Sequence, residues 1–82
     1  MLYERGGEYG NFAKVATRVT ECAKALGLAE MAETRPDASV AAYMILVKLA
    51  RLAHKPNHRD SWVDIEGYAR LMSSALPPPV SA

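Results

Sequence analysis

The sequence contains a single cysteine, Cys22, and almost no net charge. One thiol cannot form an intramolecular disulfide or anchor a zinc site by itself, so the usual supports of a small domain are absent. A formal net charge of +1 gives no bulk attraction to nucleic acid or to an anionic membrane, and we expect neither as a partner. Because 82 residues are few for a self-sufficient core, we expect a homo-oligomer.

Long apolar runs are also missing. No stretch of about 18 uncharged apolar residues occurs, and the N-terminal sequence MLYERGGEYG lacks the apolar segment of a secretory signal. Hydrophobic residues make up 50% and charged residues 23% of the chain, as in folded globular proteins. We therefore expect a folded protein of the cytoplasm.

The two-residue alternation of β-strands is absent, whereas apolar residues recur at helical spacing. This pattern predicts an all-α fold, a small bundle of three main helices at about 12–26, 36–54 and 58–75, completed by oligomerisation. The segment LAEMAETRPD is too short to assign. The expected domain organisation is a flexible lead (1–10), a single helical domain (11–76) and a proline-rich tail (77–82).

Capping residues set the predicted helix ends. Asn11 is a suitable N-cap, Gly27 a stop, and Thr34 begins a T-x-x-D start with Pro36 in the first turn. Asn57, followed by Asp60 three residues later, predicts the start of the last helix.

The apolar positions of the middle helix cover an arc of about 180°, broader than the roughly 100° stripe of a surface helix, which predicts a central position. Cys22 falls among the apolar positions of the first helix, and we expect a buried, unreactive thiol.

Charged residues border the apolar arcs of the last two helices. Asp60, Asp64 and Tyr68 share one side of the last helix, while Lys48 and Arg51 lie on the matching edge of the middle helix. A charge beside a core needs a partner, because its desolvation alone costs several kcal/mol. Two interpretations remain open: an ion pair that joins the two helices, or a polar site that binds a ligand.

Other residues of this region also allow two interpretations. Trp62 fits an interhelical or intersubunit anchor, or a platform for a base. Gly67 costs about 1 kcal/mol in mid-helix relative to alanine, which predicts close approach of a helix, a subunit or a ligand.

The segment KLARLAHKPNHR, which includes Arg59, suits a phosphate site or an ordinary solvated corner. Asp60 and Asp64 would repel DNA. Because Pro56 separates His54 from His58 and no H-E-x-x-H motif occurs, we expect no metal and no cofactor.

Three motifs resemble a family of small helical proteins from actinobacterial phages and prophages, whose function is largely unknown. They are Y-G-x-F (9–12), M-I-x-x-K-x-A-R (44–51) and H-R-D-S-W-V-D-I-x-G-Y-A (58–69), and the resemblance covers about residues 8–72. It implies a phage or prophage origin and therefore the cytoplasm of a bacterial host. Relatives often carry a further apolar helix before Y-G-x-F, whereas eight residues precede Tyr9 here.

The sequence is more remotely similar to phage domains associated with nucleotide modification and to the all-α MazG-like nucleotide pyrophosphohydrolases. Those hydrolases bind magnesium through E-E-x-x-E and E-x-x-D arrays. Met44, Lys48 and Arg51 occupy the corresponding helix here, so the metal ligands are missing. The resemblance implies nucleotide binding without catalysis.

The leading hypothesis is a phage-encoded, nucleotide-related binding protein that sequesters a nucleotide or cyclic nucleotide signal of host defence. In it, Lys48, Arg51 and Arg59 contact phosphate, Trp62 or Tyr68 contacts the base, and Asp60 or Asp64 orients the basic groups or the ribose. The first alternative is a structural or protein-interaction module without a small-molecule ligand. The second is a metal-dependent nucleotide hydrolase with Asp60, Asp64 and Glu8 as ligands.

Overall fold

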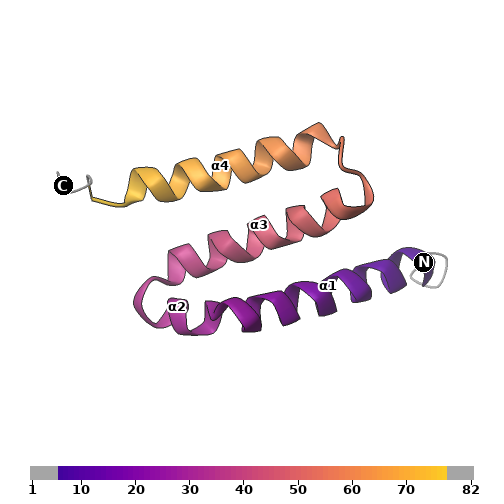
Figure 1. Ribbon diagram of the computed structural model, residues 1–82, viewed down its shortest axis with the longest axis horizontal. Coiled ribbons are helices and arrows are strands. Elements are labelled where there is room, and N and C mark those ends of the chain that lie inside the picture. Colours follow the sequence, from indigo (N-terminus) through magenta and orange to yellow (C-terminus); the bar gives the residue numbers. More distant parts are fainter. Residues whose placement is uncertain (1–5, 78–82) are drawn as a thin grey trace.

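The chain folds into helices joined by tight turns (Figure 1). The computed structural model describes residues 6–77, with side chains from residue 11 onward. Within this range lie four helices and no strand, which confirms the predicted all-α class. The helices are α1 (Gly6–Leu26), α2 (Leu28–Thr34), α3 (Pro36–His54) and α4 (Arg59–Ala75).

The helix bounds agree with the sequence predictions to within one residue except at the start of α1. The bounds of α3 are those predicted, and α4 begins one residue later than predicted. Helix α1 begins at Gly6, so the predicted start at Phe12 is wrong and Asn11 lies inside the helix. Cap preference is a weak signal, and backbone hydrogen bonding continues the helix through Asn11. Residues 1–5 of the predicted lead and 78–82 of the predicted tail lie outside the described residues.

Gly27 ends α1, as predicted, and also precedes α2. Its φ of 81° lies in the left-handed region, where a side chain is strained, and its N–H donates to the Ala23 carbonyl at 3.0 Å. The short helix α2, which the sequence left unassigned, starts directly after this residue.

The predicted N-caps of α3 and α4 were each misplaced by one residue. Thr34 is the last residue of α2, and Arg35 takes the cap position of α3 without a side-chain cap bond. The cap of α4 is His58, whose Nδ1 accepts the Ser61 N–H at 3.2 Å. The imidazole nitrogen thus accepts the N-cap hydrogen bond that a carboxylate or hydroxyl oxygen usually accepts at this position.

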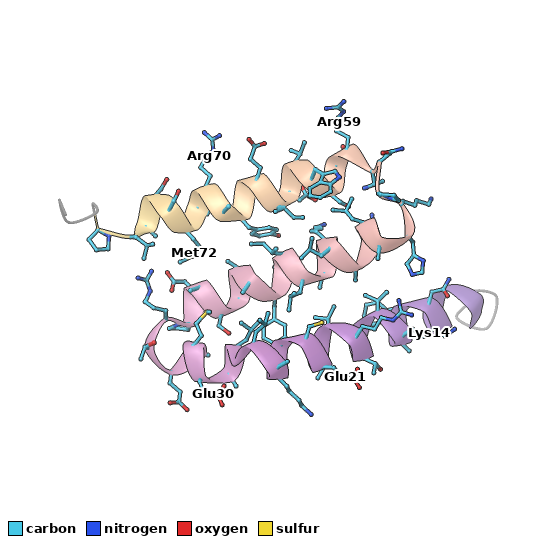
Figure 2. All side chains as sticks on the ribbon, in the orientation of Figure 1. Lys14, Glu21, Glu30, Arg59, Arg70 and Met72 are labelled. Carbon is cyan, nitrogen blue, oxygen red and sulfur yellow. The ribbon has the colours of Figure 1, made fainter. Side chains whose placement is uncertain are left out.

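Helices α1, α3 and α4 lie side by side in one layer, with α3 in the middle (Figures 1 and 2). Helix α3 contacts each of the other three, which confirms its predicted central position, whereas α1 and α4 make no contact over the described residues. The molecule measures 54 × 28 × 21 Å. The charged ends of Arg59 and Arg70 point away from α3 at the outer edge of α4 (Figure 2).

Few side chains are buried in this layer. Among residues 11–77 the buried apolar ones are Val19, Ala23, Leu28, Ala41 and Leu52. Ser39 is also buried, and its hydroxyl donates to the Leu28 carbonyl at 2.8 Å, which ties α3 to α2. Cys22 is exposed, so its predicted burial is wrong. A single layer covers each helix only at its sides, and the thiol lies on a broad face.

Candidate functional site

An ion pair joins α3 to α4. Lys48 Nζ lies 3.0 Å from Asp64 Oδ2, with the side chains 22% and 46% exposed. The helices are antiparallel across the turn at residues 55–58, so the matching edges predicted from the sequence do meet. At this exposure a salt bridge typically contributes about 0.2–1 kcal/mol. The pair therefore joins the two helices with only a modest gain in stability.

Arg51 and Asp60 extend this polar region. Arg51 follows Lys48 by three residues and Asp60 precedes Asp64 by four, which puts each beside its neighbour on the same side of its helix. Both are exposed, and neither forms an ion pair with any side chain of residues 11–77. We call the broad face that carries Lys48, Arg51, Asp60 and Asp64 the charged face.

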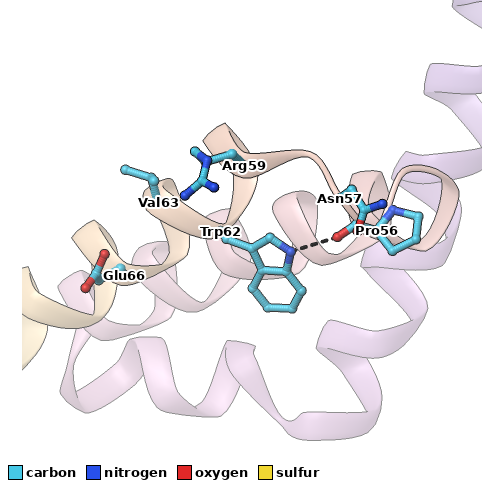
Figure 3. A pocket seen from close by; sticks show the side chains of 6 residues that line it. All are labelled: Pro56, Asn57, Arg59, Trp62, Val63 and Glu66. Carbon is cyan, nitrogen blue, oxygen red and sulfur yellow. Dashed lines mark hydrogen bonds between the residues drawn. The ribbon is translucent and has the colours of Figure 1, made fainter.

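Trp62 lines a groove formed by the α3–α4 turn and the first turns of α4 (Figure 3). Its indole N–H donates to the Pro56 carbonyl at 2.9 Å, and the side chain remains 52% exposed. The groove is an open depression of about 580 Å³. Its lining residues are Pro56, Asn57, Arg59, Trp62, Val63 and Glu66.

The groove contains charges of both signs. Arg59 would attract a phosphate, but Glu66 lines the same depression and would repel one. Glu66 Oε2 also lies 3.9 Å from Arg70 Nη2, one helical turn further along α4. Sequence reasoning missed Glu66 and Val63, although the spacing of four between Trp62 and Glu66 could have indicated a shared surface.

The predicted site residues are thus divided between separate surfaces. Lys48, Arg51, Asp60 and Asp64 lie on the charged face, whereas Arg59 and Trp62 line the groove. At 100° per residue, Trp62 and Asp64 lie about 160° apart around α4, so they cannot share one shallow pocket. Tyr68 is half-buried, and its hydroxyl makes no hydrogen bond with a carboxylate among the described side chains.

Gly67 has free space around it. A Cβ added at this position would meet no described atom within 4 Å, so the expected close approach of a neighbouring helix is wrong for this chain. Approach of a ligand or of another subunit to Gly67 stays a prediction.

A further ion pair lies away from these surfaces, at the start of α3. Arg35 Nη2 and Nε donate to the Asp37 carboxylate at 2.8 and 3.0 Å, and the Ala38 N–H donates to it at 2.8 Å. These bonds, led by the one from Arg35, lower the pKa of Asp37 to about 2. This carboxylate is already satisfied and is poorly suited to bind a ligand.

The described residues contain neither a metal-binding cluster nor a helix suited to span a membrane. They include no group of three or more His, Cys, Asp or Glu side chains placed to hold a metal ion. Glu8, one of the ligands of the hydrolase hypothesis, has its side chain outside the described range. No described helix is long and apolar enough to cross a membrane.

The fold defines a small all-α protein built as one layer of helices. Residues 2–75 match the model of a family described as a domain of unknown function, DUF6378. Because the match covers most of the chain, the protein belongs to this family. No curated protein and no solved structure matches it.

Proposed function

We propose that this protein is a protein-interaction module whose helical layer is completed by association with another polypeptide chain. The observation that carries the proposal is the single layer, in which few apolar side chains of residues 11–77 are buried. Stable domains are generally built from two or more packed layers around a shared core. A second layer would supply the burial that this chain lacks.

The Lys48–Asp64 pair also supports this proposal over a phosphate pocket on the charged face. The Lys48 ammonium already binds a carboxylate at 3.0 Å. A ligand phosphate would have to displace Asp64 or bind beside its negative charge, and either costs part of the attraction. The pair therefore suits a structural link between α3 and α4 better than a ligand contact.

A second candidate function is the binding of a nucleotide or cyclic nucleotide by a phage-encoded protein that counters host defence. The exposed indole of Trp62, fixed by its bond to Pro56, would stack on a base, and Arg59 would contact phosphate. The openness of the groove and the presence of Glu66 favour the interaction module instead.

The test combines light scattering with calorimetric titration of nucleotides and cyclic dinucleotides. For the interaction module we expect an assembled mass at micromolar concentration, preserved in the double variant Lys48→Met with Asp64→Asn. Its free energy of unfolding should fall by no more than about 1 kcal/mol, since the pair is partly exposed. No nucleotide should release heat.

Two outcomes would contradict the interaction module. A monomeric mass with a melting temperature independent of protein concentration would remove the need for a second layer. Nucleotide binding that is lost in Trp62→Ala but retained in Val63→Ala would establish the second candidate, because both side chains line the groove and only Trp62 has an indole ring.

A further inference from the structure

We infer that one broad face of the layer is a self-association surface and that a second copy of this chain covers it. The inference rests on the proposed function and names its partner. The face, called the uncharged face below, is defined by Cys22 and Leu26 on α1, Ala42 and Leu49 on α3, and Trp62 and Leu76 on α4.

The position of these residues follows from the Lys48–Asp64 pair, which marks the charged side of the α3–α4 seam. On α3, turning from Lys48 past the buried Leu52 leads to Leu49 on the opposite side of the layer. On α4, turning from Asp64 past the buried Ser61 leads to Trp62 in the same way. Leu49 and Trp62 therefore lie on the same broad face.

Helix α1 contributes to the same face because it runs antiparallel to α3 and turns its buried Val19 and Ala23 toward it. With right-handed helices, Cys22 and Leu26 then lie on the side of Leu49 and Trp62. Cys22 is exposed and Leu26 is 67% exposed. The uncharged face thus extends over all three helices of the layer.

The two broad faces differ in charge and not in the presence of apolar groups. The charged face also exposes Val47 and Leu71, but it carries the Lys48–Asp64 pair and Arg51 among them. None of the six residues that define the uncharged face is ionic. An apolar centre free of charge is the composition of the core of a homodimer interface.

The size of the face matches what a stable dimer needs. Helices of 21, 19 and 17 residues extend about 25–31 Å at roughly 1.5 Å per residue. The layer is 28 Å across, so the face has a projected area of about 700–850 Å². A typical stable interface buries about 800 Å² on each partner.

A second copy suits this face better than an unrelated partner for two reasons. The missing core belongs to the fold itself, so its cover is needed wherever the chain is folded, and another copy is then always present. The edges of the uncharged face are also self-complementary. Arg18 lies at its edge on α1, and Glu66 lies at its edge on α4. A two-fold axis parallel to α3 lays α1 of one copy over α4 of the other, which brings these opposite charges to the same edge.

The test compares Leu49→Glu with Val47→Glu. The two residues lie on the same helix, are 43% and 39% exposed, and face opposite sides of the layer. We expect Leu49→Glu to raise the dissociation constant, measured by sedimentation equilibrium, by at least about 100-fold, because a two-fold interface places two buried carboxylates in it. Val47→Glu should keep the mass of the wild type.

Cys22 provides a second measurement that needs no substitution. The uncharged face includes this thiol, so its reaction with a maleimide should slow by about tenfold or more as the wild type assembles with rising concentration. If Leu49→Glu loses its helical circular dichroism and so fails to fold, the reaction rate of Cys22 in the wild type still tests whether the uncharged face is covered.

The outcomes separate this inference from the proposed function. An assembled wild type with a freely reactive Cys22, or equal masses of Leu49→Glu and Val47→Glu, would overturn the uncharged face and leave the interaction module intact. A wild type that stays monomeric at every concentration would overturn both.

Discussion

Asp37 shows how much one exposed side chain gains from its immediate neighbours. Arg35 and the Ala38 N–H both donate to its carboxylate, and its pKa falls from 3.8 to about 2. At the predicted site, Lys48 and Asp64 form a partly exposed pair between α3 and α4. At the scale of the residue, the hydrogen bonds to Asp37 therefore serve the start of a helix and not a binding site.

The lowered pKa of Asp37 predicts a pH dependence of stability. Because the folded pKa lies below the unfolded value of about 4, the stabilisation is present above about pH 4 and is lost as pH falls toward 2. We expect the melting temperature of the wild type to fall more between pH 6 and pH 2 than that of Asp37→Asn. The difference should be small, since the Asp37 side chain is 52% exposed. Thermal denaturation at low salt measures it, and a gap between the two proteins that does not change with pH would contradict it.

At the scale of the element, each helix is specified mainly by local signals. Pro36 starts α3, the bounds of which the sequence predicted correctly, and the Lys55-Pro56 break separates α3 from α4. The start of α1 was mispredicted because a good cap residue, Asn11, lies within a helix that begins at Gly6. Local sequence preferences thus predict where the helices lie, but they do not predict which residue caps each helix.

The open space around Gly67 gives a prediction for α4. Gly67→Ala should raise the free energy of unfolding by about 0.5–1 kcal/mol, because alanine costs less backbone entropy in a helix and meets no neighbour. Gly27→Ala is the matched control and should destabilise by roughly 1–2 kcal/mol, since φ there is 81°. Urea denaturation of both variants measures the effect. Destabilisation by Gly67→Ala would instead indicate that a partner or ligand approaches this position.

At the scale of the whole molecule, the layer leaves α3 covered at two sides only. Helices α1 and α4 lie at its two edges and do not contact each other over the described residues. The broad apolar arc of α3 therefore extends onto a face that no helix within residues 6–77 covers. The sequence indicated that α3 has several neighbours, but only the arrangement of the helices shows where cover is missing.

The proposed association predicts that the melting temperature depends on protein concentration. Diluting the protein from about 100 μM to about 1 μM should lower the melting temperature by several degrees, since mass action favours the dissociated, less stable chain. Circular dichroism in cells of different path length measures this. Leu49→Glu serves as the control and should melt at one temperature throughout the series.

Sequence patterns were enough to predict the helical class, the central position of α3, the stop at Gly27 and the facing of the charged edges of α3 and α4. These follow from short-range chemistry, in which periodicity, prolines and glycines act within a few residues. Only the packing of the helices in one layer shows that Trp62 stays 52% exposed beside a groove and that Cys22 is exposed. A helical wheel gives the angle of a side chain around its own axis, whereas burial depends on which sides of the helix its neighbours occupy.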